Sequence, residues 1–334
     1  LLIGATDPGG AGLAADWRVC AQLGMSACSV VTAVTAQDHT GVSETGILSA
    51  RQLRAQLNSI DWKQVAAIKT GMLGNADIIE ALLPYLREEI PLVIDPVLAA
   101  SSGGRLLDEA GQKKLVEQLL PRADLVTPNL AEAIALSGSH DRPPAGAVEL
   151  ASALRRLGAA AVLITGAGED PRAASISDYF DSDSHRAWLS GRRWPDRDNV
   201  RGTGCSLATA IAAAVTRGHP LSEAVVLGKA ILTAAIGSAQ RDGRAWQLQG
   251  IDWPRTESQL PRWTDTLAGS RWVPAFPGCG STRLGIYPVV DSVDWIRRLV
   301  PLGVETIQLR LKSGSPAQID QQIGDAVEFC RAFP

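Results

Sequence analysis

The sequence predicts an α/β fold with a doubly wound, mostly parallel sheet that carries helices on both faces. Two observations support this prediction. From residue 1 to residue 240, short runs rich in β-branched residues alternate with amphipathic segments of helix length, a pattern typical of parallel strands joined by crossover helices. Strand candidates such as PLVIDPV (residues 91–97) are apolar without alternation, as expected where both faces of a sheet are covered.

The predicted strands are short apolar runs bounded by Gly, Pro or polar residues. In chain order they cover 1–5, 28–34, 65–71, 91–97, 123–128 and 160–166. The predicted helices lie between these strands and after the last one, where apolar residues recur with the helical period. They cover 11–23, 49–58, 76–88, 108–120, 130–137, 145–157, 204–217 and 221–240. The polar stretch 169–200 predicts an edge hairpin with a loop.

The pattern changes beyond residue 240. Residues 241–283 hold four tryptophans, several prolines and little periodicity. We expect an ordered segment that packs on the first domain, because a disordered linker would carry few aromatic residues. A new strand–helix–strand pattern then starts at Leu284. The predicted organisation is a domain over 1–240, a connecting segment over 241–283 and the start of a second domain over 284–334.

The composition is that of an ordinary globular protein. Hydrophobic residues make up 46% of the chain, and the net charge is −3. Lys and Arg form no block or stripe, which argues against a nucleic-acid partner, and no run of 18 apolar residues predicts a membrane span. Five scattered cysteines without a C-x-x-C pair favour a reducing cytoplasm. The chain starts at Leu1 inside a strand-like run and stops in mid-pattern at Pro334, so we expect a fragment of a longer protein.

A glycine-rich turn follows the first predicted strand. Gly10, Gly12 and Ala15 satisfy G-x-G-x-x-G/A, and Asp38 ends the next strand, which is formally a dinucleotide fingerprint. Two other interpretations stay open. The turn could let backbone approach a small ligand, with Asp7 and Asp16 supplying carboxylates, or it could be only a tight strand-to-helix turn.

A second glycine motif, Gly202-Thr203-Gly204-Cys205, opens a helix of small apolar residues. The first turn of a helix leaves up to four amides without an intrahelical acceptor, and with the helix dipole they predict an anion site. The alternative is a capping turn with Thr203 as the cap and an inert, buried Cys205. Cys205 favours the anion site, because a helix N-terminus lowers the pKa of a thiol and makes it reactive.

Polar oxygens also follow the strand at 123–128. Asn129 and Glu132 lie at i and i+3 on a first helical turn at the carboxyl end of the sheet, which suits a hydrated Mg²⁺ beside phosphates. A capping box explains the same pair, and both interpretations can hold. Lys69 and Lys229 stand among apolar neighbours. Such lysines usually extend their ammonium group to water, but one near an anion site would bind phosphate.

Taken in order, six motifs of residues 1–240 resemble the hydroxymethylpyrimidine/phosphomethylpyrimidine kinases of thiamine biosynthesis, members of the ribokinase-like superfamily. The motifs are TDPGGAGLAAD, VVTAVTAQDHTGV, KTGMLGNADIIEAL, VIDPVLAASSGGRLL, LLPRADLVTPNLAEA and NVRGTGCSLATAIAA. The resemblance implies a ribokinase-like fold that uses ATP and Mg²⁺. It implies phosphorylation of 4-amino-5-hydroxymethyl-2-methylpyrimidine and then of its monophosphate, so we expect small-molecule partners, with a homodimer as a candidate assembly.

The resemblance also implies site residues. Gly202, Thr203 and Gly204 would bind the transferring phosphoryl group, and the Cys205 thiolate would accept the proton of the hydroxymethyl group. The residues implied around the pyrimidine are Gln37, Asp16, Met72 and Val97. The residues implied at the nucleotide are Asn129, Glu132, Thr165 and Lys229, with Glu132 at the metal. Positioning and electrostatics account for most of the catalysis in phosphoryl transfer.

From Leu284 onward, LGIYPVVDSVDWIRRLVPLGVETIQLRLK resembles the beginning of thiamine-phosphate synthase, a (β/α)₈ barrel. The resemblance implies that Gln308, Arg310 and Lys312 bind the pyrimidine diphosphate, and strand alternation puts all three on one face. About 51 residues of this part are present, whereas such barrels need about 200 or more. We therefore expect an incomplete barrel without synthase activity, cut from a bifunctional protein whose kinase product is the synthase substrate.

Two other functions stay open at this point. A pyridoxal-type vitamin kinase would share the fold and differ in the ring compound that drives ADP release. A non-catalytic pyrimidine-binding module would bind the pyrimidine without producing ADP. A dinucleotide oxidoreductase is the remaining alternative, and it would bind NAD(P).

Overall fold

The computed structural model describes residues 1–6, 10–37, 41–100, 103–138, 146–168, 174–197, 200–242, 245–265, 287–304 and 306–332. The chain forms two compact units, Leu1–Ser270 and Arg271–Pro334. The first unit therefore extends past residue 240, where the sequence analysis ended the first domain. Each unit is described by itself below.

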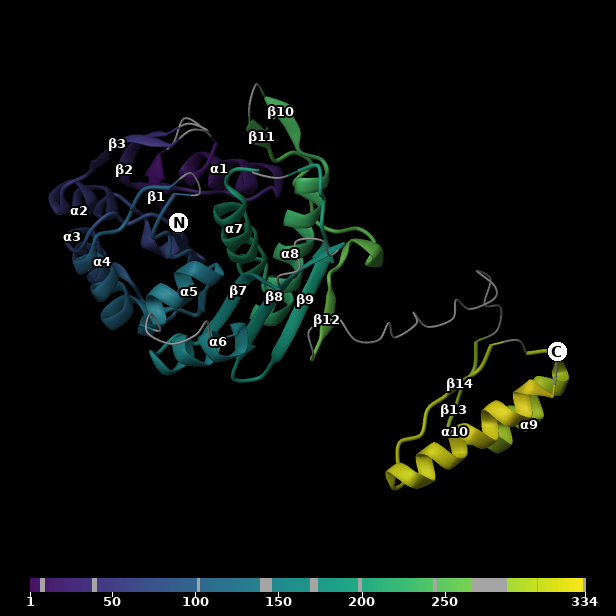
Figure 1. The fold of residues 1–334 in the computed structure, drawn as a ribbon. Coiled ribbons are helices and arrows are strands. Elements are labelled where there is room, and N and C mark those ends of the chain that lie inside the picture. The colour runs from purple at the N-terminus through teal and green to yellow at the C-terminus, as the bar shows by residue number, and fades with distance from the viewer. Residues whose placement is uncertain are drawn as a thin grey trace. The chain divides into compact units, whose positions relative to one another are not determined.

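The first unit is built on a ten-stranded sheet with the order β12-β9-β8-β7-β6-β5-β4-β1-β2-β3 (Figure 1). The strands are β1 (Leu2–Thr6), β2 (Ser29–Gln37), β3 (Val42–Ile47), β4 (Ile68–Thr70), β5 (Leu92–Ile94), β6 (Leu125–Val126), β7 (Ala161–Gly168), β8 (Ser175–Ser182), β9 (Arg186–Arg192) and β12 (Arg262–Thr264). The run from β2 to β7 is parallel. Antiparallel strands flank it: β3 on one side and β8, β9 and β12 on the other.

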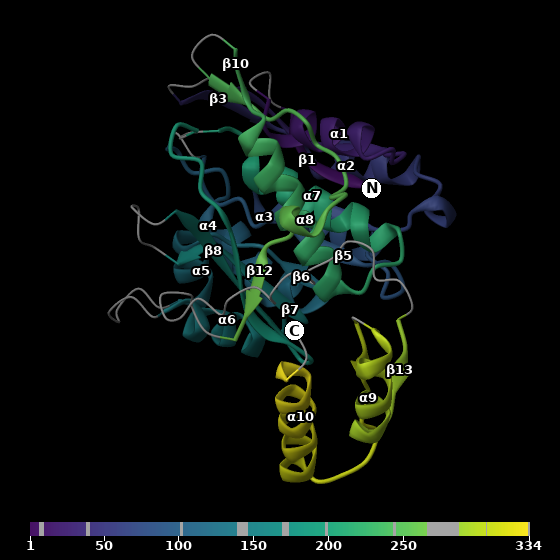
Figure 2. The ribbon, with the colours of Figure 1, turned by 90° about the vertical axis from the view of Figure 1, so that its right-hand side faces the viewer.

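Helices cover both faces of this sheet, as predicted. One face carries α1 (Gly12–Gln22), α7 (Thr203–Thr216) and α8 (Leu221–Gly237), which contact one another in that order (Figures 1 and 2). The other face carries α2 (Ala50–Asn58), α3 (Ala76–Leu82), α4 (Glu109–Lys114), α5 (Leu130–Ser137) and α6 (Ala147–Arg156). Strand β5 shows why its sequence is continuously apolar. Leu92 and Ile94 belong to the core under α2–α6, whereas Val93 belongs to the core under α7.

Most predicted elements are present within a few residues of their expected bounds. The structure adds β3 and β12, which the periodicity did not predict. Strand β12 comes from the predicted connecting segment and pairs with β9, so the hairpin of β8 and β9 is not at the edge of the sheet. Trp253 of the same segment donates from its indole nitrogen to the Leu23 carbonyl at 3.2 Å. The tryptophan-rich segment up to residue 265 therefore packs as part of the first unit. Residues 266–286 lie outside the described residues.

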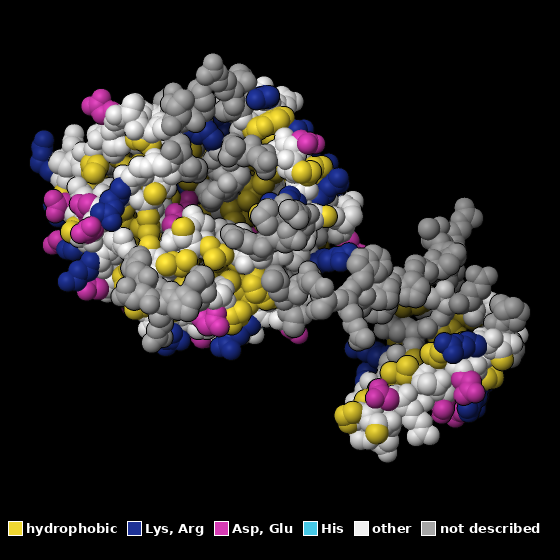
Figure 3. All heavy atoms as spheres, in the orientation of Figure 1, with side chains coloured by type: hydrophobic (Ala, Val, Ile, Leu, Met, Phe, Trp, Pro, Cys, Tyr) yellow, Lys and Arg dark blue, Asp and Glu magenta, His cyan; other side chains and the backbone are white. Residues whose placement is uncertain are grey.

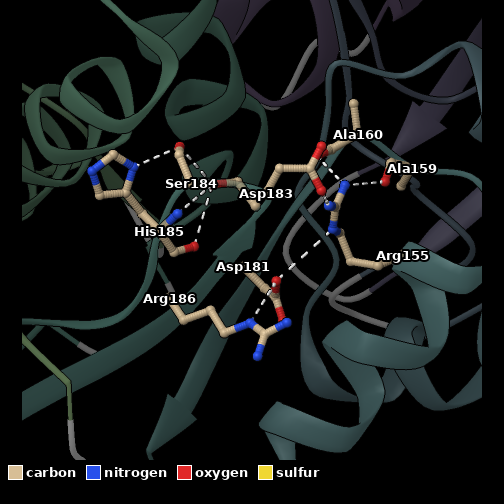
Figure 4. A network of polar contacts seen from close by, with 9 residues as sticks. Arg155, Ala159, Ala160, Asp181, Asp183, Ser184, His185 and Arg186 are labelled. Carbon is tan, nitrogen blue, oxygen red and sulfur yellow. Dashed lines mark hydrogen bonds and ion pairs between the residues drawn. The ribbon is translucent and has the colours of Figure 1, made fainter.

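A polar network fixes the turn between β8 and β9 to the end of α6 (Figure 4). Asp181, 2% exposed, lies 3.8 Å from Arg155 Nε and 3.5 Å from Arg186 Nε. Arg155 also pairs with Asp183 and donates to the Ala159 carbonyl. Because Ser182 pairs with Ala161 at the start of β7, this network lies opposite the carboxyl ends of the parallel strands. The site described below lies at the edge formed by the carboxyl ends of the parallel strands.

The second unit contains β13 (Val289–Val290), α9 (Val293–Leu299), β14 (Gln308–Leu309) and α10 (Pro316–Arg331). The two strands are parallel, so β13, α9 and β14 form a β-α-β unit. Val290, Val293, Ile296 and Ala326 form its small core.

Charged side chains of both signs are interspersed on the face of the protein drawn in Figure 3. None of the helices that the structure describes has the length and hydropathy required to cross a membrane.

Candidate active site

A cavity of about 540 Å³ opens among the loops that follow the parallel strands. Of the twelve residues predicted for the kinase site, eleven line this cavity, and Lys229 does not. They come from strands and helices far apart in the sequence: Asp16, Gln37, Met72, Val97, Asn129, Glu132, Thr165, Gly202, Thr203, Gly204 and Cys205. In an open α/β sheet the loops after the strands meet at one edge, which is where ligands bind. The fold therefore gathers these residues in one place.

The N-terminus of α7 faces the cavity. Its N-cap is Gly202 rather than Thr203, and no side chain caps the helix. The main-chain N–H groups of Thr203, Gly204 and Cys205 belong to the first turn, which has no intrahelical acceptors, and none of the described residues accepts from them. These amides and the positive end of the helix dipole make a suitable site for a phosphoryl group.

Gly202 is required by the backbone at this turn. It has φ +73, a left-handed conformation that residues with a side chain rarely adopt. A methyl group there would stand 2.9 Å from the Gly10 carbonyl oxygen and 3.2 Å from the Ala15 Cβ. Gly202 thus brings the start of α7 against the glycine-rich turn and α1. Asp7, which precedes this turn, and Asp38, which follows the next strand, lie outside the described residues.

The prediction that Cys205 has a lowered thiol pKa is wrong for this cavity. Burial raises its pKa, and the Asp95 and Asp16 carboxylates add to the increase, whereas Lys69 and a hydrogen bond from the Gly12 N–H oppose it. Desolvation of the thiolate and two nearby negative charges outweigh the groups that lower this pKa, Lys69 and the Gly12 amide. Cys205 is consequently a neutral thiol when no ligand is bound.

Lys69 and Asp16 form a buried ion pair beneath the α7 N-terminus. Lys69 Nζ lies 2.9 and 3.1 Å from the two Asp16 carboxylate oxygens, and the Thr209 hydroxyl donates to Asp16 at 2.7 Å. Asp95 Oδ2 lies 3.9 Å from the same ammonium group. Although burial lowers the pKa of Lys69, the surrounding negative charges raise it overall. Lys69 is therefore a fixed positive charge in the wall of the cavity.

The predicted pyrimidine residues lie around one part of the cavity. Gln37 ends β2, is half-buried and lines the cavity. Met72 belongs to a small buried cluster with Ala5 and Ala33, against which Val97 packs. This combination offers an apolar surface for a ring and an amide that both donates and accepts. Asp16 differs from the prediction, because its carboxylate is occupied by Lys69 and Thr209.

The predicted nucleotide residues Asn129 and Glu132 form a complete capping box at the start of α5. Asn129 Oδ1 accepts from the Glu132 N–H, and Glu132 Oε2 accepts from the Asn129 N–H, each at 2.9 Å. Burial raises the pKa of Glu132 to about 8, and the Asp95 carboxylate adds to the increase. The donor set fits Mg²⁺, which usually binds one or two carboxylates and fills its remaining positions with water and phosphate oxygens.

Thr165 and Lys229 are placed differently. Thr165 bridges to Asn129 at the end of β7 and lines the cavity. Lys229, on α8, is buried and pairs with Asp178 at 2.7 Å. The structure thus keeps Lys229 in an ion pair outside the cavity lining.

The second unit has a separate cavity of about 560 Å³. Arg310 and Lys312 line it together with Asp291 and Trp295. Gln308 is not among its lining residues and accepts from the Tyr287 hydroxyl at 3.1 Å.

Sequence reasoning missed Asp95, which is 5% exposed and lines the cavity between Lys69 and the α7 N-terminus. A signal was present: a carboxylate that ends a continuously apolar strand is rarely buried without a partner or a role.

Comparisons with known proteins agree with this geometry. Residues 7–248 match the family of phosphomethylpyrimidine kinase. The chain is 39% identical to a hydroxymethylpyrimidine/phosphomethylpyrimidine kinase of Rhizobium meliloti (strain 1021) over 72% of this chain and 90% of that protein. It is 31% identical to the thiamine biosynthetic bifunctional enzyme TH1 of Arabidopsis thaliana over 99% of this chain, and it spans 64% of that longer protein.

A solved structure supports the fold. The ADP complex of Bacillus subtilis pyridoxal kinase superposes with a TM-score of 0.66 at 29% identity, covering 74% of this chain and 96% of that one. The large sheet with helices on both faces is thus the ribokinase-like α/β fold. From the match over residues 7–248 and the similarity to the Rhizobium enzyme, the chain belongs to the phosphomethylpyrimidine kinase family.

Proposed function

We propose that this chain is a phosphotransferase that moves the γ-phosphoryl group of ATP to 4-amino-5-hydroxymethyl-2-methylpyrimidine and then to its monophosphate, in thiamine biosynthesis. The single observation that carries the proposal is the first turn of α7 in the wall of the 540 Å³ cavity, where no described residue accepts from the amides and no side chain caps the helix. Gln37 and Met72 line the same cavity, and so do Asn129 and Glu132. One cavity therefore offers a surface for a ring, an anion site and a carboxylate for a metal-bound nucleotide.

Each group has a physical role in this proposal. The Gln37 amide pairs with neighbouring donor and acceptor groups of the aminopyrimidine, and Met72 and Val97 contact the ring. The amides of Thr203 and Gly204 stabilise the charge that develops on the transferring phosphoryl group. Glu132 and Asn129 would hold Mg²⁺, which when bound neutralises phosphate charge. Thr165 is proposed at the nucleotide, and Lys229 is proposed to support the nucleotide side from its ion pair with Asp178.

The test is ADP release by the purified chain with hydroxymethylpyrimidine, its monophosphate or pyridoxal as the acceptor. We expect both pyrimidines to drive ADP release more efficiently than pyridoxal. Gln37→Ala should raise KM for the pyrimidine by about tenfold, since a lost buried hydrogen bond costs about 1–1.5 kcal/mol, with KM for ATP unchanged. Efficient turnover of pyridoxal alone would refute the assignment, and pyrimidine binding without ADP release would indicate a binding module.

We further propose that residues 284–334 are the start of a thiamine-phosphate synthase barrel. The β-α-β unit and the similarity to the bifunctional TH1 protein over 99% of the chain support this proposal. Arg310 and Lys312 would then bind the diphosphate product of the kinase, with Gln308 beside them on the strand. Extending the chain to the length of a full barrel should add synthase activity, which the present chain should lack. A homodimer and a cytoplasmic location remain predictions, for which size-exclusion chromatography and cell fractionation are the tests.

A further inference from the structure

Strand β2 contains one residue more than its parallel neighbour β1 just before it reaches the cavity. The two strands pair residue by residue up to Gly4 and Val31, and the next pair is Ala5 and Ala33. Thr32 is therefore the extra residue of a β-bulge. Bulges are rare between parallel strands, and they occur often beside active sites, where they redirect side chains.

The bulge changes the face of the sheet on which the following side chains lie. Side chains of a strand alternate between the two faces, and a shift of one residue moves every later side chain to the other face. Before the bulge, Val31 packs against a small core that includes side chains of α1. After it, Ala33 packs with Met72, and Gln37, four residues further and so on the same face, lines the cavity. Without Thr32, the alternation would put Gln37 on the face of Val31.

The Thr32 side chain joins β2 to the loop that follows β4. Thr32 is fully buried, and its hydroxyl donates to the Met72 carbonyl at 2.6 Å. Its own carbonyl accepts from the Leu48 N–H at 2.8 Å. Because β1 separates β4 from β2 in the sheet, the hydroxyl bond is a direct link between the two segments that carry Gln37 and Met72.

A second irregularity lies beside Gln37. Here the extra residue belongs to β3, since Ala36 pairs with Glu44 and Gln37 pairs with Val42. The skipped residue, Ser43, donates from its hydroxyl to the Ala36 carbonyl at 2.9 Å. Hydroxyl groups thus hold irregular backbone at both ends of the part of β2 that leads to Gln37.

We propose that Thr32 is a positioning residue for the pyrimidine, whose hydroxyl sets the spacing between Gln37 and Met72. This inference rests on the proposed function, in which both of those residues bind the ring. Thr32 is not among the residues that line the cavity, so it acts through its bond to the Met72 carbonyl. A rigid ring that contacts both side chains tolerates little change in their spacing, since a misplacement of about 1 Å can cost about 10²-fold.

The first test measures binding without turnover. Isothermal titration calorimetry with hydroxymethylpyrimidine and no nucleotide gives Kd for wild type, Thr32→Ser and Thr32→Ala. Both variants lack the threonine methyl group, and they differ from each other only in the hydroxyl. We expect Kd within about threefold of wild type for Thr32→Ser and about tenfold higher for Thr32→Ala, the equivalent of one hydrogen bond. Equal Kd values for the two variants would overturn the proposal. Thr32→Val replaces Thr32→Ala in this comparison if the latter does not fold.

The second test separates positioning from a purely structural role. A structural role predicts that thermal unfolding shifts in Thr32→Ala while Kd stays within about twofold of wild type, and this result would overturn the proposal. Thr70→Val is the matched control, because Thr70 is fully buried on the neighbouring strand β4 and its hydroxyl has no hydrogen-bond partner among the described residues. It should leave Kd within about twofold. An equal rise of Kd in Thr70→Val and Thr32→Ala would show a general effect of sheet packing and would also overturn the proposal.

The third test is kinetic and separates this inference from the proposed function. Thr32→Ala should raise KM for the pyrimidine by about tenfold, with kcat and KM for ATP within about threefold. A defect confined to KM for ATP would overturn the role of Thr32. Normal ADP release by wild type with equal Kd values for Thr32→Ser and Thr32→Ala would overturn this inference alone. Failure of every pyrimidine to drive ADP release, with the expected order of Kd values, would instead refute the proposed function alone.

Discussion

At the residue scale, the cavity wall contains charged side chains that are buried away from water. Lys69 is 1% exposed and pairs with Asp16, which is fully buried. A buried ion pair contributes little net stability, because desolvation of both charges offsets their attraction, but loss of one partner is costly. We therefore infer that this pair holds a positive charge in the wall of the cavity and adds little to the stability of the fold.

Gly202→Ala tests the close approach at the anion site. We expect a loss of about 1–2 kcal/mol from the left-handed backbone, and in addition a lower kcat, because a methyl group would push α7 away from the Gly10 carbonyl at 2.9 Å. Gly218→Ala is the control, since Gly218 has φ +87 and nothing within 4 Å. Thermal unfolding and kcat measure both effects. An equal loss of kcat in the two variants would contradict the proposed role of the turn.

Lys229→Ala tests whether Lys229 acts at the nucleotide or only in its ion pair. Because it leaves the buried Asp178 unpaired, we expect a loss of about 3–5 kcal/mol of unfolding free energy. Asp178→Ala combined with Lys229→Ala should restore part of this loss. If the double variant is stable but has a raised KM for ATP, Lys229 supports the nucleotide. If KM for ATP is unchanged, the role of Lys229 is structural.

At the scale of elements, the N-termini of α1, α5 and α7 all line one cavity, and α5 and α7 differ in how they are capped. α5 begins with the capping box of Asn129 and Glu132, so its first amides are partly satisfied within the protein. α7 begins with a glycine and no side-chain cap, so its amides are left for a ligand. The small residues of α7 let it pack against α1, α8 and the strands β4 and β5, which holds this open end in place.

The capping box predicts a pH dependence of stability. The pKa of Glu132 is raised from 4.5 to about 8 by burial, so the folded protein binds a proton that the unfolded chain has lost. Stability from this group is complete below about pH 4.5 and is lost as pH rises toward 8. Glu132→Gln, which stays neutral, should match wild type at pH 5 and be more stable at pH 9, as measured by urea unfolding. A stability difference that is the same at both pH values would contradict this assignment.

At the scale of the whole molecule, the sheet of the first unit is completed by a segment that follows the last helix. Strand β12 pairs with β9, and Leu248 and Ile251 are buried against α1, α7 and α8. The Ile251 N–H also donates to the Gln22 side chain at 3.0 Å. Through these contacts the segment that follows α8 packs on α1, near the N-terminus of the chain, and on α7 and α8.

Truncation tests the extent of this unit. A chain of residues 1–270 should fold and release ADP with the pyrimidine, whereas a chain of residues 1–240 should be destabilised by several kcal/mol. The shorter chain lacks the buried Leu248 and Ile251 side chains. Loss of their burial alone lowers the free energy of unfolding by about 3–6 kcal/mol. Thermal unfolding followed by circular dichroism measures the difference. Equal melting temperatures would show that the segment does not stabilise the sheet.

Much of the fold and of the site could be predicted from local patterns. The apolar strand 91–97 and the capping pair Asn129 and Glu132 follow from short-range rules, and the family motifs identified eleven residues that the structure gathers in one cavity. Strand β12 could not be predicted. Its three residues, Arg262–Thr264, are too few to show an alternation of apolar and polar residues, and they form a strand by pairing with β9, which is distant in the sequence.

The sequence by itself determined the α/β class, the elements and the glycine turn at the start of α7, because these depend on neighbours within one or two turns of the chain. Only the tertiary structure decided the chemistry of Cys205. Its thiol pKa depends on Asp95, Asp16 and Lys69, which are up to 189 positions away in the sequence. Burial and the two carboxylates raise this pKa more than Lys69 lowers it, and no local pattern contains that balance.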